Sequence, residues 1–293
     1  MPVLLAYISL ILLWSTTPLA IQWSTREVGF LFGATGRMSI GLVCISVVLL
    51  LSRQSLIISK RALLNYLVVA IQLYGSMILV CWAAQFIPSG WISLVFGLVP
   101  LMTALIAAVI LKERSLSFGK ILSYLMGLGG LGLMFHSAFA VGTTAVWAIA
   151  ALLVAALFQV VSAIWIKRLN DHIPAFVQVA GGLTLAVPAY LLTWWLADGH
   201  WPEDIPNNTL AAIGYLGVVA TTFGFALYYF ILKHLSTTRV ALITLMSPML
   251  ALLLGHFANH EPLTLHIIQG AGLILSALLV HEWAEFRLRR GGN

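Results

Sequence analysis

The stretch IPSGWISLVFGLVPLMTALIAAVILKE (residues 87–113) decides the fold of this chain, because its pattern occurs twice. The second copy, LSTTRVALITLMSPMLALLLGHFANHE (residues 235–261), begins 148 residues later, half the length of the 293-residue chain. Both copies are apolar, and each has a proline at position 14 and a terminal glutamate: Pro100 and Glu113 in the first, Pro248 and Glu261 in the second. A segment repeated at this offset predicts two related halves.

The composition excludes a soluble domain. Apolar residues make up 61% of the chain, charged residues only 8%, and the mean hydropathy is +1.02. A soluble domain carries about a quarter charged residues, which this chain lacks. Its apolar runs are continuous rather than alternating, which predicts transmembrane helices of roughly 20 residues each and not a membrane β-barrel. The fold class expected is an all-α integral membrane protein.

The apolar runs and their polar breaks predict ten spans. Five fall in residues 1–137 and five in residues 143–286. An odd number of spans per half makes the second half enter the membrane upside down relative to the first. We therefore expect two inverted five-helix repeats around a central cavity, an arrangement in which one half moves against the other. The predicted spans are 2–23, 28–51, 63–87, 89–111, 117–136, 143–167, 174–197, 208–234, 239–259 and 264–285.

The basic residues predict the orientation. Only Arg26, Lys233 and Arg239 are assigned to one side of the membrane. Cytoplasmic loops are enriched in Lys and Arg, so both termini are expected in the cytoplasm. The basic residues form no patch, so the net charge of +6 reflects membrane topology rather than nucleic-acid binding. The residues assigned to the cytoplasmic side are Arg53, Lys60, Arg61, Lys112, Arg114, Lys120, Lys167, Arg168, Arg287, Arg289 and Arg290.

Arg37 is the most informative single residue. It lies about ten residues into the second predicted span, where a charge costs at least about 2.5 kcal/mol. Such a residue usually faces a cavity or a partner, and an anionic group such as a carboxylate is the natural partner of a guanidinium. The alternative is that Arg37 lies near the outer interface and extends its charged end to water.

The paired prolines and acids of the copied segments have separate expected roles. Pro100 and Pro248 lie near the middle of their spans, where a proline removes a backbone hydrogen bond and kinks the helix. Paired kinks suit helices that line a cavity, although prolines are common in membrane helices. Glu113 and Glu261 are assigned to the cytoplasmic ends of their spans, where they are expected to brace the helix ends. No Asp or Glu lies in the middle of a span, so proton coupling through a carboxylate is not indicated.

Polar and aromatic residues inside the spans are candidates for binding a substrate, because a few such groups fix a ligand in a mostly apolar pocket. Sequence motifs of enzymes are missing: there is no HExxH, no GxSxG and no Cys/His cluster, so neither catalysis nor a metal site is expected. No cofactor is expected either. The cavity candidates, besides Arg37, are Trp14, Thr17, Tyr74, Phe96, Gln159, Trp165, Tyr228 and Thr244.

Over essentially its whole length the chain resembles the drug/metabolite transporter superfamily, in particular its EamA branch. The resemblance rests on ILLWSTTPLAIQ (residues 11–22), on GRMSIG (residues 36–41) and on the repeated proline–glutamate segment. It implies a cavity lined largely by spans 1, 3, 4, 6, 8 and 9, with Trp14, Ser15 and Arg37 at family positions. Gln159 departs from the pattern, since many members have an aromatic residue there.

Members of this family are inner-membrane carriers of amino acids, metabolites or drugs, and many are exporters. The function predicted is a secondary carrier that exports small metabolites such as amino acids by alternating access, in the lipid bilayer of a bacterial inner membrane, as a monomer or homodimer. One alternative is an importer or exchanger of sugar or phosphorylated metabolites, which would need more Lys or Arg in the cavity. The other is a non-transporting membrane partner or sensor.

Overall fold

The computed structural model describes residues 3–111, 118–169, 173–224, 227, 231 and 237–291. Within these ranges the regular structure is helical and includes no strand, so the all-α class is confirmed. The helices are α1 (Val3–Thr25), α2 (Phe30–Leu51), α3 (Lys60–Ile71), η1 (Gln72–Ser76), α4 (Met77–Ala83), α5 (Ser89–Gly97), α6 (Val99–Leu111), α7 (Phe118–Val141), α8 (Thr143–Leu169), α9 (Ala175–Ala197), α10 (Asn207–Tyr215), η2 (Leu216–Phe223), α12 (Thr237–Asn259) and α13 (Leu265–Gly291).

Eight stretches of the described chain are long and apolar enough to cross a membrane. They coincide with the first seven predicted spans and with the tenth. The eighth predicted span, 208–234, begins as α10 and η2 and is described only in part, and the ninth corresponds to α12. The described chain therefore has the long apolar helices of a multi-pass membrane protein, while the full set of ten spans stays a prediction.

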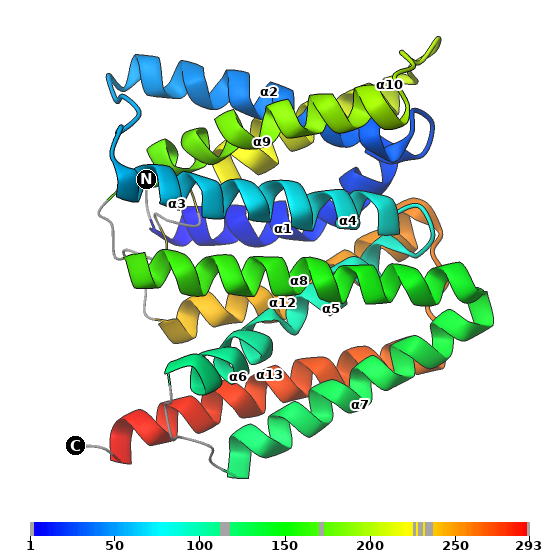
Figure 1. Ribbon diagram of the computed structural model, residues 1–293. Helices are drawn as coiled ribbons and strands as arrows, with labels where there is room; N and C mark the ends of the chain where they lie inside the picture. Colours follow the sequence, from blue (N-terminus) through cyan, green and yellow to red (C-terminus); the bar gives the residue numbers. More distant parts are fainter. Residues whose placement is uncertain are drawn as a thin grey trace.

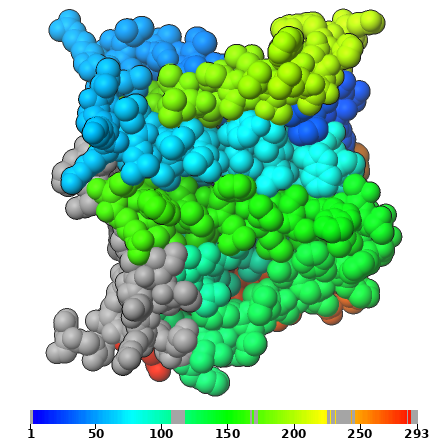
Figure 2. Space-filling model, in the orientation of Figure 1, coloured from blue at the N-terminus to red at the C-terminus, as the bar shows by residue number. Residues whose placement is uncertain are grey.

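The helices lie side by side with their ends at two opposite faces of the bundle (Figure 1). Both termini and the connection 52–59 lie at one end, and the loop 198–206 lies at the other. Segments far apart in the sequence pack together: α1 and α5 both contact α12, α9 contacts α2 and α3, and α7 runs along α13. The side chains of α9, α3, α4 and α8 fill the spaces between these helices on the face shown in Figure 2.

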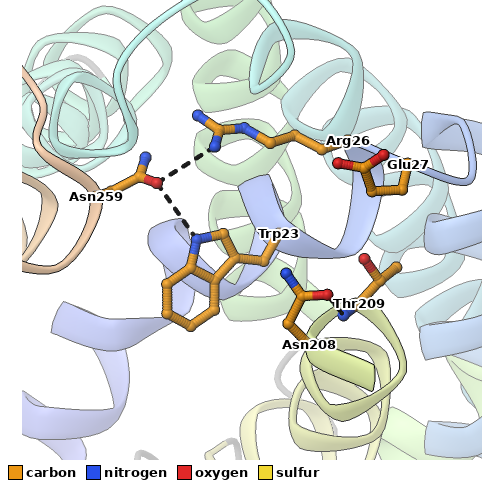
Figure 3. Close-up of a pocket in the computed structure, with 6 residues that line it drawn as sticks. All are labelled: Trp23, Arg26, Glu27, Asn208, Thr209 and Asn259. Carbon is orange, nitrogen blue, oxygen red and sulfur yellow. Dashed lines mark hydrogen bonds between the residues drawn. The ribbon is translucent and has the colours of Figure 1, made fainter. Parts of the chain in front are cut away.

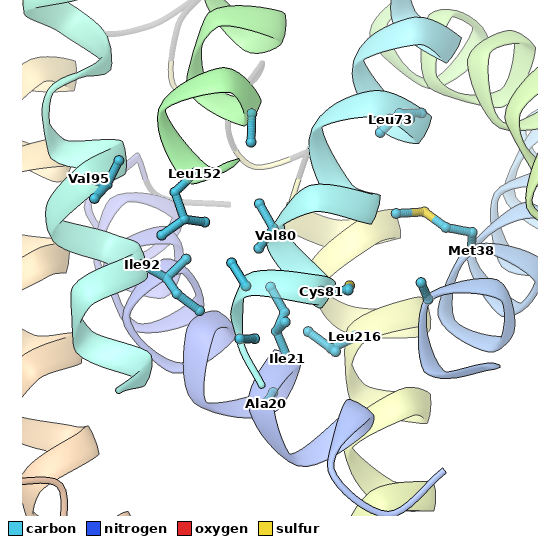
Figure 4. Close-up of a cluster of buried hydrophobic side chains, with 14 of the residues drawn as sticks. Ala20, Ile21, Met38, Leu73, Val80, Cys81, Ile92, Val95, Leu152 and Leu216 are labelled. Atoms are coloured by element: carbon cyan, nitrogen blue, oxygen red, sulfur yellow. The ribbon is translucent and has the colours of Figure 1, made fainter. Parts of the chain in front are cut away.

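A single large apolar cluster joins most of the helices. Figure 4 shows part of it, with Met38 of α2, Val80 and Cys81 of α4, Leu152 of α8 and Leu216 of η2 converging from four different elements. Dispersion and close packing hold such a cluster together within a membrane, where there is no water to exclude. Large apolar side chains also cover the outside of the bundle, as lipid-facing surfaces of membrane helices require. Examples are Leu50, Leu51, Phe118, Trp147 and Phe257.

Two of the spans contain a π-helical segment, of five residues in η1 and eight in η2. η1 interrupts the helix that α3 begins and α4 ends, and η2 follows α10 directly. In the predicted order these are the third and the eighth span, which are the third span of each half. A π-helical turn widens the helix and is common at functional sites, so both spans have an irregular segment near their middle.

The two prolines of the copied segments lie in different local structures. In the first copy the helix is interrupted at Leu98, and Pro100 is the second residue of α6. The break is expected there, because Pro100 has no N–H and disfavours helical geometry in the residue before it. In the second copy α12 continues through Pro248. A helix break therefore accompanies only one of the two prolines, and the paired kinks stay a prediction.

The two copied segments also touch. A Cβ atom built on Gly97 would lie 3.5 Å from Cγ of Pro248, and one on Gly90 would lie 2.9 Å from Cα of Leu252. Residue numbers decrease along α12 in the direction in which they increase along α5, so the two helices run antiparallel. A side chain on Gly90 would collide with the α12 backbone, and glycine there permits the close approach.

Candidate functional site

Arg37 lies in α2, and its side chain is buried in the bundle with only 5% exposed. The guanidinium is beside the Cys81 thiol of α4 and interacts with Tyr190 of α9. The backbone of η2 passes close by, since a Cβ on Gly217 would lie 2.9 Å from the Arg37 carbonyl oxygen. Arg37 therefore sits where α2, α4, α9 and η2 meet, and its charged end does not reach the surface of the described structure.

The Arg37 side chain has unused hydrogen-bond donors. Nε and Nη1 are buried, and neither finds an acceptor among the described residues. No Asp or Glu in the described part of the chain forms an ion pair with it either. A buried guanidinium without an anion is costly, and its planar fork of N–H groups matches a carboxylate or phosphate group. The arrangement is suited to receive an anionic group of a ligand.

Tyr190 connects Arg37 to one of the predicted cavity residues. The Tyr190 ring contacts the ring of Tyr74 at 5.0 Å between centroids, and its hydroxyl donates to the Leu73 carbonyl oxygen at 2.9 Å. The Tyr74 hydroxyl shares a hydrogen bond of 2.6 Å with Thr193 Oγ1. Tyr74 belongs to η1, so the π-helical turn of the third span lies next to the arginine site.

The other predicted cavity residues are scattered. Trp14 packs beside a small apolar cluster of Leu10 and Ile243, and Thr17 donates its hydroxyl to the Leu13 carbonyl oxygen at 2.6 Å within α1. Phe96 packs against the main core, and Gln159 is partly buried in α8. Trp165 is 47% exposed on α8, which places it on the outer surface rather than in the interior. Glu113, Tyr228 and the side chain of Thr244 lie outside the described residues.

A second set of polar side chains, joined by hydrogen bonds, lies at the end of the bundle opposite the termini. Its centre is Asn259, the last residue of α12. The Asn259 Nδ2 donates to Gln22 Oε1 at 2.7 Å and to Glu261 Oε1 at 2.9 Å. Its Oδ1 accepts from Arg26 Nη1 at 3.3 Å and from Trp23 Nε1 at 3.5 Å, the two bonds drawn in Figure 3. Because the amide uses both its donors and its acceptor, it ties α1 to α12.

Glu261 is a buried part of this group, with 8% of the residue exposed. Its Oε2 accepts from the backbone N–H of Gly90 at 3.4 Å, at the start of α5, where the positive end of a helix favours a carboxylate. The hydrogen bonds of Asn259 place Glu261 at the same end as Arg26. Glu261 therefore does not lie at the basic end with the termini, as predicted, because α12 carries the chain from that end to the end of Arg26 before residue 261.

The same geometry corrects the assignment of Arg239. It lies in the first turn of α12, and the last residue of that helix bonds Arg26. Arg239 is therefore at the opposite end from Arg26, together with Arg53 and Lys60, rather than on the Arg26 side as predicted. Lys233 lies outside the described residues.

A polar pocket of about 250 Å³ opens beside Asn259 (Figure 3). Six residues from α1, the turn after it, α10 and α12 line it: Trp23, Arg26, Glu27, Asn208, Thr209 and Asn259. None of these residues was among the sequence candidates. They fall at span ends, where a polar residue is ordinary, and no spacing in the sequence indicates that residues 23–27, 208–209 and 259 meet.

Comparison with known proteins places the chain in a family. The model of the EamA-like transporter family matches residues 1–136 and 146–281, so the chain belongs to this family of membrane transporters. The resemblance to EamA-type drug/metabolite transporters is thereby confirmed.

Curated relatives carry the same class name. An uncharacterized transporter of Bacillus subtilis, YoaV, is 24% identical over 97% of this chain and 98% of its own. An uncharacterized transporter of Archaeoglobus fulgidus is also 24% identical, over 67% of this chain and 68% of its own. A solved crystal structure shares the fold with a TM-score of 0.67 and 22% identity, over 94% of this chain and 96% of that one.

Proposed function

We propose that this transporter is a secondary carrier that exports small carboxylated metabolites such as amino acids across a bacterial inner membrane by alternating access. The observation that carries the proposal is Arg37, a buried guanidinium with Nε and Nη1 free of acceptors in the described structure. A charge kept inside a membrane protein at this cost is explained by a ligand that uses it. A carboxylate would accept two parallel N–H bonds from the guanidinium.

The packing of the helices supports the inverted repeat that alternating access needs. The copied segments cross antiparallel, as two inverted copies must. Corresponding spans of the two halves make corresponding contacts. The first span of each half packs on the fourth span of the other half: α1 packs on α12, and α8 packs on α5 and α6. The second span of each half packs on the third span of the other half: α2 packs on η2, and α9 packs on α3. With a π-helical turn in the third span of each half, these paired contacts favour two related bundles that rock about the site.

The charges at the two ends of the bundle support the orientation with both termini in the cytoplasm. Lys60 begins α3, Lys120 lies in the first turn of α7 and Arg168 in the last turn of α8, all at the end that holds the termini. The opposite end carries the acidic loop with Asp198 and Glu203. An excess of Lys and Arg marks the cytoplasmic side.

Metabolite profiling of the growth medium tests the proposal. Cells would express the wild type, Arg37→Ala, Arg61→Ala or an empty vector, at matched membrane levels. Arg61 is exposed at the start of α3, so its replacement removes an arginine without touching the buried site. We expect an amino acid or similar acid to accumulate outside the wild-type and Arg61→Ala cells only. Media identical in all four cultures would contradict export, and depletion of a compound by the wild type would favour the importer or exchanger alternative.

A further inference from the structure

The polar pocket beside Asn259 carries charges of both signs. Arg26 and Glu27 are neighbours in the turn after α1, both are exposed, and both line the pocket. They do not pair with each other: the Arg26 guanidinium turns toward Asn259, away from the Glu27 carboxylate (Figure 3). Glu27 makes no ion pair or hydrogen bond through its carboxylate within the described residues. The pocket thus offers one cation and one anion to a ligand.

The opposite wall of the pocket is the start of α10. The positive end of this nine-residue helix faces the pocket with Asn208 and Thr209. Thr209 is fully buried, and its Oγ1 has no hydrogen-bond partner in the described structure. A buried hydroxyl without a partner is uncommon, and here it lies in the first turn of a helix, whose positive end favours negative charge. This wall is suited to the anionic end of a ligand.

We propose that the pocket is a second binding site, which holds a zwitterionic solute of amino-acid size at the outer end of the transporter. The carboxylate would bind between Arg26 and the Thr209 hydroxyl, and the ammonium would bind Glu27. The volume of about 250 Å³ is below the roughly 300–1,000 Å³ of pockets for drug-sized ligands, so a larger drug does not fit. This inference rests on the proposed function, since a site at the outer end serves a chain that moves such solutes outward.

Binding there would act on the polar group that closes this end. A carboxylate on Arg26 competes with Asn259 Oδ1 for the Nη1 donor, whose bond is 3.3 Å long. Loss of the Arg26 bond would leave Asn259 bonded to Gln22 and Trp23 of α1, so this end of the bundle would keep fewer hydrogen bonds between residues 22–26 and α12. A bound solute would in this way weaken the hydrogen bonds around Asn259 at the end of the bundle through which it leaves.

Ligand-induced thermal stabilisation of the purified transporter in lipid nanodiscs tests the second site. The probes are the proteinogenic L-amino acids, one at a time, and the N-acetyl and methyl ester forms of any that stabilises. The proteins are the wild type, Arg37→Ala, and Arg37→Ala combined with Glu27→Gln or with Glu203→Gln. The Arg37→Ala background removes the buried site, and Glu203→Gln removes an acidic charge at the same end outside the pocket. Unliganded melting temperatures show whether each variant is folded.

We expect at least one amino acid to stabilise Arg37→Ala and its Glu203→Gln combination, and to bind about tenfold more weakly when Glu27→Gln is present. Both blocked derivatives should bind poorly, because each lacks one charge. Binding by the wild type that disappears in Arg37→Ala would overturn the second site and leave the proposed function standing. Binding unaffected by Glu27→Gln would also overturn it. Failure of every amino acid to stabilise any of the proteins would contradict both proposals.

Discussion

Arg37 is a cation that the fold buries without a described anion. Its neighbours, the Cys81 thiol and the Tyr190 ring, cannot neutralise it, because the thiol is a weak acceptor and the Tyr190 hydroxyl already donates to a backbone carbonyl oxygen. Burying Arg37 therefore lowers the stability of the fold, whereas under the proposed function the same guanidinium binds the substrate. Functional sites are where natural proteins retain such costs.

Arg37→Met is expected to raise the melting temperature of the purified protein while abolishing transport. The apolar side chain of similar length removes a charge that costs at least about 2.5 kcal/mol inside a membrane span. Thermal unfolding of wild type and variant in the same nanodiscs measures the first effect, and the profiling described above measures the second. A variant that melts well below the wild type would show that Arg37 is a structural residue with a partner.

Gly255 is expected to be essential for the polar group around Glu261. A Cβ on Gly255 would occupy the space of the Glu261 carboxylate and lie 2.9 Å from Ser89 Oγ. Gly255→Ala should displace the carboxylate from Gly90 and Asn259 and cost about 1–3 kcal/mol of stability. Gly272→Ala is the matched control, since nothing lies within 4 Å of its Cβ position. Equal melting temperatures of the two variants would contradict the described packing.

At the scale of the element, the contact between α5 and α12 is the distinctive feature. Pro248 packs on Gly97 one residue before the break at Leu98, so the interrupted copy and the continuous copy meet at their prolines. The Leu98 N–H donates to the Val95 carbonyl oxygen at 3.0 Å, a tightened turn that ends α5. A small displacement of α12 would therefore act directly on the interruption between α5 and α6 at Leu98.

Pro248→Ala is expected to slow turnover more than it weakens substrate binding. The alanine restores an N–H that can bond within α12, which changes the helix where it touches Gly97. Pro100 lies in the first turn of α6, a position where proline is well tolerated, so Pro100→Ala should have the smaller effect. Initial-rate transport at several substrate concentrations separates kcat from KM. A raised KM with unchanged kcat would show that the prolines shape the pocket instead.

At the scale of the whole molecule, the two ends of the bundle differ in charge. Basic residues gather at the end with the termini, while the other end holds the polar pocket and the acidic 198–206 loop. The carboxylates Glu261 and Glu27 both belong to this second end. The charge difference predicts a single orientation in the membrane.

Reporter fusions test the orientation. A green fluorescent protein fused after Asn293 is expected to fluoresce, and alkaline phosphatase fused there is expected to be inactive, because it needs an oxidising compartment. Phosphatase fused within the 198–206 loop should be active. The reverse pattern would place the polar pocket in the cytoplasm and contradict export through it.

Much of the fold could be predicted from the sequence because spans are a matter of length and composition. The first seven and the tenth agree with the structure, and Arg37 stood out because a charge inside a span is costly. The π-helical turns at residues 72–76 and 216–223 have no such signature. The pocket was missed because three distant segments build it. Glu261 was placed at the wrong end because its side depends on how often the chain crosses the membrane.

Efflux from proteoliposomes tests the central claim most directly, because it contains only this chain, lipid and solute. Purified wild type, Arg37→Ala and Arg61→Ala would be reconstituted into vesicles loaded with a mixture of isotope-labelled L-amino acids, and the external solution analysed by mass spectrometry. We predict that at least one amino acid leaves wild-type and Arg61→Ala vesicles about 100-fold faster than Arg37→Ala vesicles, the loss expected for a desolvated charge-assisted pair. Equal efflux from all three and from protein-free vesicles would contradict a carrier that binds carboxylates at Arg37.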